Sequence, residues 1–107
     1  MKRGELYRVY RGSRYDPKDY RTYLIASRQE LIDNTFSSVI CAPVHSLYGE
    51  VDTQIEIGVE EGMKQDSAIF CDELLSIPKS LLTNYVGSLS ADKMEEVNAA
   101  LRIALSV

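Results

Sequence analysis

Residues 53–60 read Thr-Gln-Ile-Glu-Ile-Gly-Val-Glu, in which Thr, Ile, Ile and Val alternate with Gln, Glu, Gly and Glu. Successive side chains of a β-strand point to opposite faces of a sheet, so this alternation predicts a strand with one buried and one wet face. Glu61 and Gly62 follow and predict a turn. The centre of the chain therefore favours a β-sheet.

Strand patterns continue on both sides of this stretch. Residues 20–26 form a nearly continuous apolar and aromatic run, which is typical of a strand buried on both faces. Residues 11–19 contain Gly, Ser, Asp and Pro and predict a loop. Further strands are predicted at Glu5–Tyr10, 38–44, 67–75 and 85–89.

Helix signals are short except at the end of the chain. Residues 27–30 (SRQE) match a capping box and predict a helical turn over about 28–33. Pro78 suits the first position of a second short turn. Ser90 is a good N-cap, and apolar residues at helical spacing predict an amphipathic helix over residues 91–105.

The length of 107 residues fits one compact domain over the whole chain. Short strands at close spacing, followed by one terminal helix, predict a mainly β fold in the form of a small curled sheet or barrel. A barrel removes the open sheet edges that invite aggregation.

Charge is distributed unevenly along the chain, whose net charge is −4. Residues 1–28 hold eight basic and three acidic residues, a net of +5, and the remainder carries −9. A one-sided basic segment predicts a local anionic partner, although a solvated charged loop gives the same pattern.

Cys41 and Cys71 each lie in an apolar run and are predicted to be buried free thiols. Two cysteines and one histidine at wide spacing do not make a zinc site, so no metal or cofactor is expected. No apolar run is long enough to cross a membrane. No apolar stretch follows Met1-Lys2-Arg3, so we expect no export signal and a cytoplasmic protein.

Several motifs resemble those of the MazF/PemK toxins, which belong to the CcdB/MazF barrel superfamily. Residues 3–7 (RGELY) are similar to their Arg-Gly-Asp/Glu-Ile-Trp/Tyr opening. Residues 39–46 (VICAPVHS) resemble their Val-Ile-Val-Ala-Pro-Ile-Thr-Ser, and residues 71–77 (CDELLSI) resemble Cys-Asp-Gln-Ile-Arg-Thr-Ile. Weaker similarities lie at residues 21–25, 62–63, 66–69, 86–90 and 94–101. The matches keep their order over almost the whole chain.

The resemblance implies an SH3-like barrel that forms a homodimer. It also implies a toxin of a type II toxin–antitoxin system. Such toxins are ribosome-independent, metal-independent endoribonucleases, or mRNA interferases, which cut single-stranded RNA through the ribose 2′-hydroxyl. The implied partner is an antitoxin whose acidic, partly disordered tail covers the basic RNA groove. Operator DNA would be bound only through the toxin–antitoxin complex.

Three residues are carried over as catalytic from the resemblance. Arg21 matches the family's catalytic arginine, and a guanidinium fork suits the charge that builds up on a phosphorane. His45 replaces the family's threonine and is a credible acid or base, because histidine titrates near neutral pH. Ser46 keeps the family's serine and is expected to hold a phosphate oxygen. Without the family context, Arg21 would be interpreted as a surface ion pair and His45 as a structural residue.

Five residues are predicted to bind the RNA: Arg11, Arg14, Tyr15, Lys18 and Glu73. The three cations offset the loss of a family arginine, which is Leu75 here, and Glu73 replaces a family glutamine. Tyr15 and Tyr20 have rings on which unpaired bases can stack, worth about 1–3 kcal/mol per base. For Tyr20, packing within the barrel is the favoured interpretation.

Two other functions remain open at this point. The first is a CcdB-like gyrase poison, which requires a C-terminal Trp-Gly-Ile tail, whereas this chain has no tryptophan and ends in Ala-Leu-Ser-Val. The second is a catalytically degenerate barrel that only binds an antitoxin or DNA, which the changes at His45 and Leu75 favour.

Overall fold

A computed structural model describes residues 1–10 and 19–107. The first half of this part of the chain contains β1 (Glu5–Tyr10), β2 (Tyr20–Ile25), α1 (Gln29–Asp33), β3 (Ser38–His45) and β4 (Gln54–Ile57). The second half contains η1 (Val59–Glu61), β5 (Ser67–Phe70), η2 (Cys71–Glu73), β6 (Leu75–Pro78), η3 (Lys79–Leu81), β7 (Asn84–Ser88) and α2 (Ala91–Leu105). The η elements are single 3₁₀ turns.

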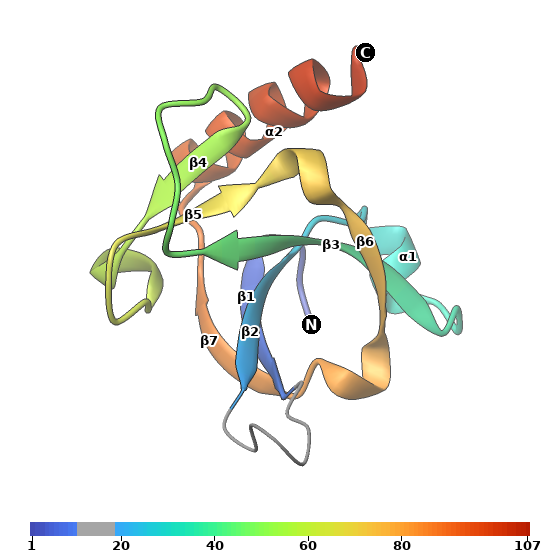
Figure 1. The fold of residues 1–107 in the computed structure, drawn as a ribbon. Helices are drawn as coiled ribbons and strands as arrows, with labels where there is room; N and C mark the ends of the chain where they lie inside the picture. Colours follow the sequence, from blue (N-terminus) through green and yellow to red (C-terminus); the bar gives the residue numbers. More distant parts are fainter. Residues whose placement is uncertain (11–18) are drawn as a thin grey trace.

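The strands form one antiparallel sheet in the order β4-β5-β3-β2-β1-β7. One edge of β3 pairs with both β5 and β6, and the sheet curls into a half-barrel with α2 beside it (Figure 1). The predicted mainly β architecture with a C-terminal helix is therefore confirmed. The bounds of β1 and α2 agree with the sequence analysis to the residue.

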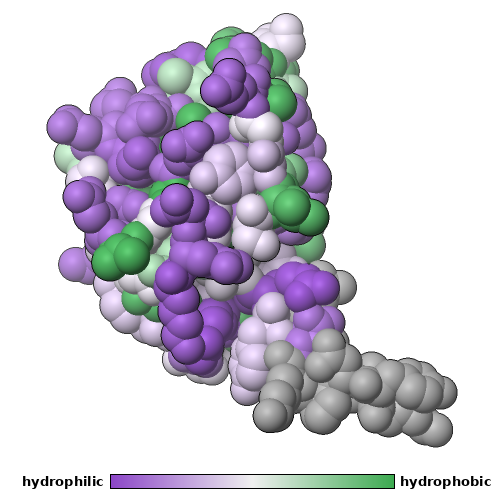
Figure 2. Space-filling model, turned by 60° about the vertical axis from the view of Figure 1, so that its left-hand side comes forward, coloured by the Kyte–Doolittle hydropathy of each residue, from purple (hydrophilic) through white to green (hydrophobic). Residues whose placement is uncertain are grey.

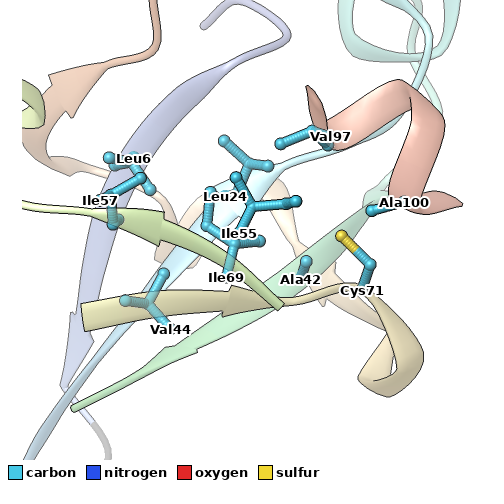
Figure 3. Close-up of a cluster of buried hydrophobic side chains, with 10 residues drawn as sticks. All are labelled: Leu6, Leu24, Ala42, Val44, Ile55, Ile57, Ile69, Cys71, Val97 and Ala100. Atoms are coloured by element: carbon cyan, nitrogen blue, oxygen red, sulfur yellow. The ribbon is translucent and has the colours of Figure 1, made fainter. Parts of the chain in front are cut away.

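The sheet has a hydrophobic core on each face. One core lies under α2, where Val97 and Ala100 pack on the strands (Figure 3). The other core includes Ile32 of α1 and side chains from β1, β2, β3 and β6. Because the sheet is covered on both faces, Tyr23, Leu24 and Ile25 are each at most 2% exposed, as the continuous run predicts.

The predicted strand over residues 67–75 is wrong in its extent. The 3₁₀ turn η2 interrupts it, so that β5 and β6 are separate strands along one edge of β3. A hydrogen bond from Thr53 Oγ1 to the Asp72 carboxylate (2.5 Å) and the burial of Cys71 stabilise this turn. Both contacts join segments that are distant in sequence, so a local pattern does not reveal them.

Two predictions on helix ends and strand length are also corrected. The Ser27 hydroxyl does not cap α1, because it accepts a hydrogen bond from the backbone N–H of Ile40 (2.6 Å). The alternation at 53–60 predicts a longer strand than the structure has, because β4 ends at Ile57. Val59, which the pattern places on the buried face, is 78% exposed. The Ser90 cap is confirmed, since its hydroxyl accepts from the N–H of Lys93 (3.1 Å).

Gly62 and Gly87 mark a close crossing of two backbones. A Cβ on Gly62 would lie 2.4 Å from the carbonyl oxygen of Val86, and a Cβ on Gly87 would lie 2.0 Å from that of Glu61. Gly62 also has a positive φ of 96°, which favours glycine. Glycine at both positions lets the segment after η1 lie directly against β7, so residues 63–65 are held next to the sheet.

Cys41 and Cys71 are buried and free, as the sequence predicts. Burial raises the pKa of the Cys41 thiol to about 12. Burial, and then the nearby Asp72 carboxylate, raise the pKa of Cys71 to about 11. Both groups are therefore protonated at neutral pH. Of the helices that the structure describes, none has the length and apolar character needed to span a membrane.

Candidate functional site

A groove of about 400 Å³ lies beside the start of β2 and the end of β3. Arg21, His45 and Ser46 line it, so the three residues predicted as catalytic surround one hollow. We call it the Arg21 groove. The other lining residues are Tyr20, Thr22, Val44, Leu47, Met63, Gln65 and Ser67.

Strand register brings Arg21 close to His45. In the antiparallel pairing of β2 with β3, Thr22 lies opposite Val44. Arg21 and His45 are the next residues along the two strands, so they occupy matching positions on neighbouring strands. Residues that are separated in sequence thus meet because the sheet aligns them.

The Arg21 side chain is half-exposed and held at one end. Its Nη1 atom forms an ion pair with Asp19 and donates to the carbonyl of Tyr20 (3.3 Å). Nε and Nη2 have no hydrogen-bond partner in the described part of the chain. The guanidinium therefore keeps donors for an anionic group in the groove.

The His45 imidazole is fixed by two neighbours. Its Nε2 atom lies 3.1 Å from Oε1 of Glu73, and its ring meets the Phe70 ring edge-on at a centroid distance of 4.6 Å. A carboxylate only accepts hydrogen bonds, so this contact suits the tautomer in which Nε2 donates and Nδ1 is the acceptor. His45 therefore has one nitrogen available as a base.

Charge in the groove differs from that of the whole protein. The chain has 16 acidic and 12 basic residues, yet no Asp or Glu is among the described residues that line the Arg21 groove. An imidazole base beside a guanidinium can remove a proton and stabilise the negative charge that results. Among residues 1–10 and 19–107, no three His, Cys, Asp or Glu side chains gather as a metal-binding cluster.

The predicted RNA-binding residues have different outcomes. Arg11, Arg14, Tyr15 and Lys18 lie outside the described residues. Glu73 contacts His45 and is not among the residues that line the Arg21 groove, so its contact with RNA stays a prediction. The prediction that Tyr20 packs inside the barrel is wrong, because the residue is 44% exposed and lines the groove.

Sequence reasoning gave no role to Met63 or Gln65. Both lie just after Gly62, in the segment that the backbone crossing holds against β7, and both line the Arg21 groove. Phe70 was also missed, although its ring orients His45. No local motif marks these residues, because only the tertiary path of the chain brings them to the groove.

Comparison with known proteins identifies relatives over nearly the whole chain. The family of PemK-like, MazF-like toxins of type II toxin–antitoxin systems matches residues 2–105. A search of curated proteins gives no match.

Solved structures share the fold at low sequence identity. The Mycobacterium tuberculosis toxin MazF-mt6 is 20% identical with a TM-score of 0.82, over 96% of this chain and 97% of that one. An endoribonuclease in complex with its cognate antitoxin, from a mycobacterial species, is 21% identical with a TM-score of 0.84, over 100% and 96% of the two chains.

A third example is MazE–MazF (Form-II) from Deinococcus radiodurans, which is 17% identical with a TM-score of 0.78 over 100% and 96% of the two chains. These likenesses establish the fold, and the family match spans all the strands and both helices. The chain therefore belongs to the PemK/MazF family of toxins of type II toxin–antitoxin systems.

Proposed function

We propose that this toxin is an endoribonuclease that cuts single-stranded RNA in the Arg21 groove, without a ribosome and without a metal ion. The observation that carries the proposal is the meeting of Arg21, His45 and Ser46 around one hollow that no described carboxylate lines. Membership of a family of endoribonuclease toxins supports the same reaction.

The proposed reaction uses the RNA's own sugar as the nucleophile. Nδ1 of His45 takes the proton of the ribose 2′-hydroxyl, and the 2′-oxygen forms a bond to the adjacent phosphorus. The bond from phosphorus to the 5′-oxygen of the next nucleotide then breaks, that oxygen takes up a proton from water, and His45 gives its proton back to the solvent. The products are a 2′,3′-cyclic phosphate and a 5′-hydroxyl, so atoms and charge balance.

Arg21 and Ser46 act on the phosphate. Negative charge grows on the two non-bridging oxygens as the phosphorane forms, and the free donors of Arg21 stabilise it. The exposed Ser46 hydroxyl donates to a phosphate oxygen and helps to orient it. Glu73 is a positioning residue, because it fixes which nitrogen of His45 is unprotonated.

The partners proposed here follow from the family and the charge pattern. We expect a cytoplasmic homodimer whose cognate antitoxin lays an acidic tail over the basic groove. Operator DNA would be bound only through that complex. A short neighbouring gene for a protein with an acidic tail is the simplest genomic observation that supports this arrangement.

Cleavage of RNA in EDTA tests the proposal. Purified protein incubated with a mixed-sequence single-stranded RNA should give products with cyclic phosphate and 5′-hydroxyl ends. A DNA oligomer of the same sequence should stay intact, because it lacks the 2′-hydroxyl. Arg21→Ala should lower the rate by about 100- to 1,000-fold, the usual cost of losing one such donor.

The matched control is Arg28→Ala, because Arg28 is an exposed arginine outside the Arg21 groove. It should cut at the wild-type rate. Intact RNA across a broad panel of sequences at low salt, from a protein that still binds its antitoxin, would contradict the proposal. That result would instead identify a barrel that binds without cutting.

A further inference from the structure

Asp19 lies immediately before β2 and forms an ion pair with Arg21. The two residues are two positions apart, which is the interval at which the side chains of an extended chain share a face. The Asp19 side chain is 26% exposed, and Asp19 is not among the described residues that line the Arg21 groove. The carboxylate therefore holds the guanidinium from outside the groove.

The contacts of Arg21 occupy one nitrogen of its guanidinium. Nη1 donates to Asp19 and to the backbone carbonyl of Tyr20 (3.3 Å), whereas Nε and Nη2 have no hydrogen-bond partner among the residues that the structure describes. A guanidinium is flat and has two edges, each of which presents a pair of N–H groups to two oxygens of one phosphate. The edge that includes Nη1 is occupied, so the edge formed by Nε and Nη2 stays open.

Asp19 also changes the charge beside the groove. Its negative charge offsets that of the Arg21 guanidinium, so the pair attracts a phosphate less strongly than a free arginine does. The side of the molecule that comes forward in Figure 2 is mostly hydrophilic, including the surface next to the end of β1 and the start of β2. An ion pair at such a surface contributes little to stability. Orientation of Arg21 is therefore the role that the geometry of Asp19 supports.

We propose that Asp19 is a positioning residue, which turns the Nε and Nη2 edge of Arg21 towards the phosphate of a bound RNA. This inference rests on the proposed function, since it states how Arg21 is prepared for the cleavage reaction. A misplacement of about 1 Å in a reacting group can cost 100-fold in rate, so an arginine that is held at Nη1 is worth more than one that rotates freely. The weaker attraction for the phosphate of the intact RNA leaves the open edge to act mainly on the charge that grows in the transition state.

Two variants separate orientation from charge. Asp19→Asn removes the charge but keeps an oxygen that accepts a hydrogen bond from Nη1, whereas Asp19→Ala removes both. With a short fluorogenic RNA as substrate, kcat should fall by about 10- to 100-fold in Asp19→Ala and by less in Asp19→Asn. Asp33→Asn is the matched control and should keep the wild-type kcat, because Asp33 is an exposed aspartate of α1 that accepts a hydrogen bond from Gln29 outside the groove.

Affinity for uncleavable RNA should change in the opposite direction. Both variants of Asp19 should bind a 2′-O-methyl RNA about 2- to 5-fold more tightly than the wild type at low salt, because one negative charge beside the phosphate is gone. Added salt screens exposed charges, so this gain should shrink as the salt concentration rises. Fluorescence anisotropy measures both effects. A lower kcat together with tighter binding is not what damage to the fold produces, since a partly unfolded protein loses both.

NMR spectroscopy of the arginine side chains shows which edge meets the phosphate. The Nε–H signal of Arg21, assigned by its absence in Arg21→Lys, should shift when 2′-O-methyl RNA is added to the wild type. The shift should be smaller in Asp19→Ala, where Nη1 is free to contact the phosphate instead. This measurement does not depend on cleavage.

The outcomes distinguish this inference from the cleavage proposal. If RNA is cut and Asp19→Ala keeps the wild-type kcat or exceeds it, Asp19 does not position Arg21 and the cleavage proposal stands. If no RNA is cut but the shift of the Arg21 signal requires Asp19, the positioning role stands and the cleavage proposal fails. If the signal does not shift in the wild type, or shifts equally in Asp19→Ala, the inference is overturned.

Discussion

Oε1 of Glu73 lies 3.1 Å from Nε2 of His45, so a residue predicted to contact RNA lies against the imidazole. The contact joins η2 to the end of β3, and η2 is the turn that interrupts the predicted strand. The same irregularity that the sequence pattern hides is therefore what places a carboxylate beside His45.

Replacing Glu73 should slow the chemical step more than it weakens binding. Glu73→Ala removes the acceptor that fixes the imidazole, and a hydrogen bond to a charged group contributes about 1.5–3 kcal/mol. We expect kcat to fall by about 10- to 100-fold at nearly constant KM. Glu73→Gln keeps an amide oxygen as acceptor and should retain more activity than Glu73→Ala.

Steady-state kinetics on a short fluorogenic RNA give both parameters. Glu50→Ala is the matched control, because Glu50 is an exposed glutamate outside the Arg21 groove. A rise in KM with unchanged kcat in Glu73→Ala would return Glu73 to the role of an RNA-binding residue.

Variants of His45 separate catalysis from packing. His45→Ala should lower kcat by about 100- to 10,000-fold, the usual contribution of a general acid or base. His45→Thr restores the family's hydroxyl but removes the imidazole, so it should also cut more slowly than the wild type. The measurement is the rate of RNA cleavage by the three proteins, and equal activity in all three would remove His45 from the mechanism.

Gly87→Ala should destabilise the protein. The added Cβ would lie too close to the carbonyl oxygen of Glu61. Because this oxygen belongs to the backbone, it can move only if the chain around it moves as well. Overpacking of this kind costs about 1–3 kcal/mol, so thermal denaturation should show a lower melting temperature. Gly49→Ala is the control, because a Cβ on Gly49 meets no atom within 4 Å. Equal melting temperatures for both variants would show that the crossing is not tight.

The two thiols should make the protein less stable in alkali. Burial raises the pKa of Cys41 from 9.0 to about 12 and that of Cys71 to about 11. Above pH 9 the unfolded chain loses thiol protons that the folded protein keeps, so the free energy of unfolding falls as pH rises from 9 towards 11. Tyr7, whose pKa burial and then Glu5 raise to about 12, adds to the fall above pH 10.

Urea denaturation at pH 8, 9 and 10 measures this trend. A variant with both Cys41→Ala and Cys71→Ala should lose most of the decline between pH 9 and 10, although it is less stable at every pH. In the native protein neither thiol should react readily with a thiol reagent at pH 8, and both should react in denaturant. Rapid reaction of the native protein would contradict the burial of the two side chains.

Local sequence patterns predicted the elements that depend on interactions between residues close in the sequence. The helix Ala91–Leu105 begins where Ser90 caps it, and β1 follows its run of Tyr and Val. The Ser27 cap failed because Ile40, 13 residues away, uses the hydroxyl instead. A sequence motif states which bonds a residue can make, and the tertiary fold decides which one it makes.

The candidate site likewise contains residues that sequence motifs identify and residues that only the fold brings there. Arg21, His45 and Ser46 were identified from motifs, and strand register places them together. Met63 and Gln65 reach the same groove from the segment that the glycine crossing holds against β7. Nothing in their local sequence marks them, because their proximity is a property of the fold.

The floor of the Arg21 groove belongs to a sheet face that also carries one of the cores. Val44 of the core under α2 lines the groove, and Thr22 opposite it lies two residues along β2 from the buried Leu24. The glycine crossing holds the segment of Met63 and Gln65, which line the groove as well. Exchange of single side chains could therefore reshape the groove without changing the sheet, whereas remodelling of the backbone would disturb folding at the same time.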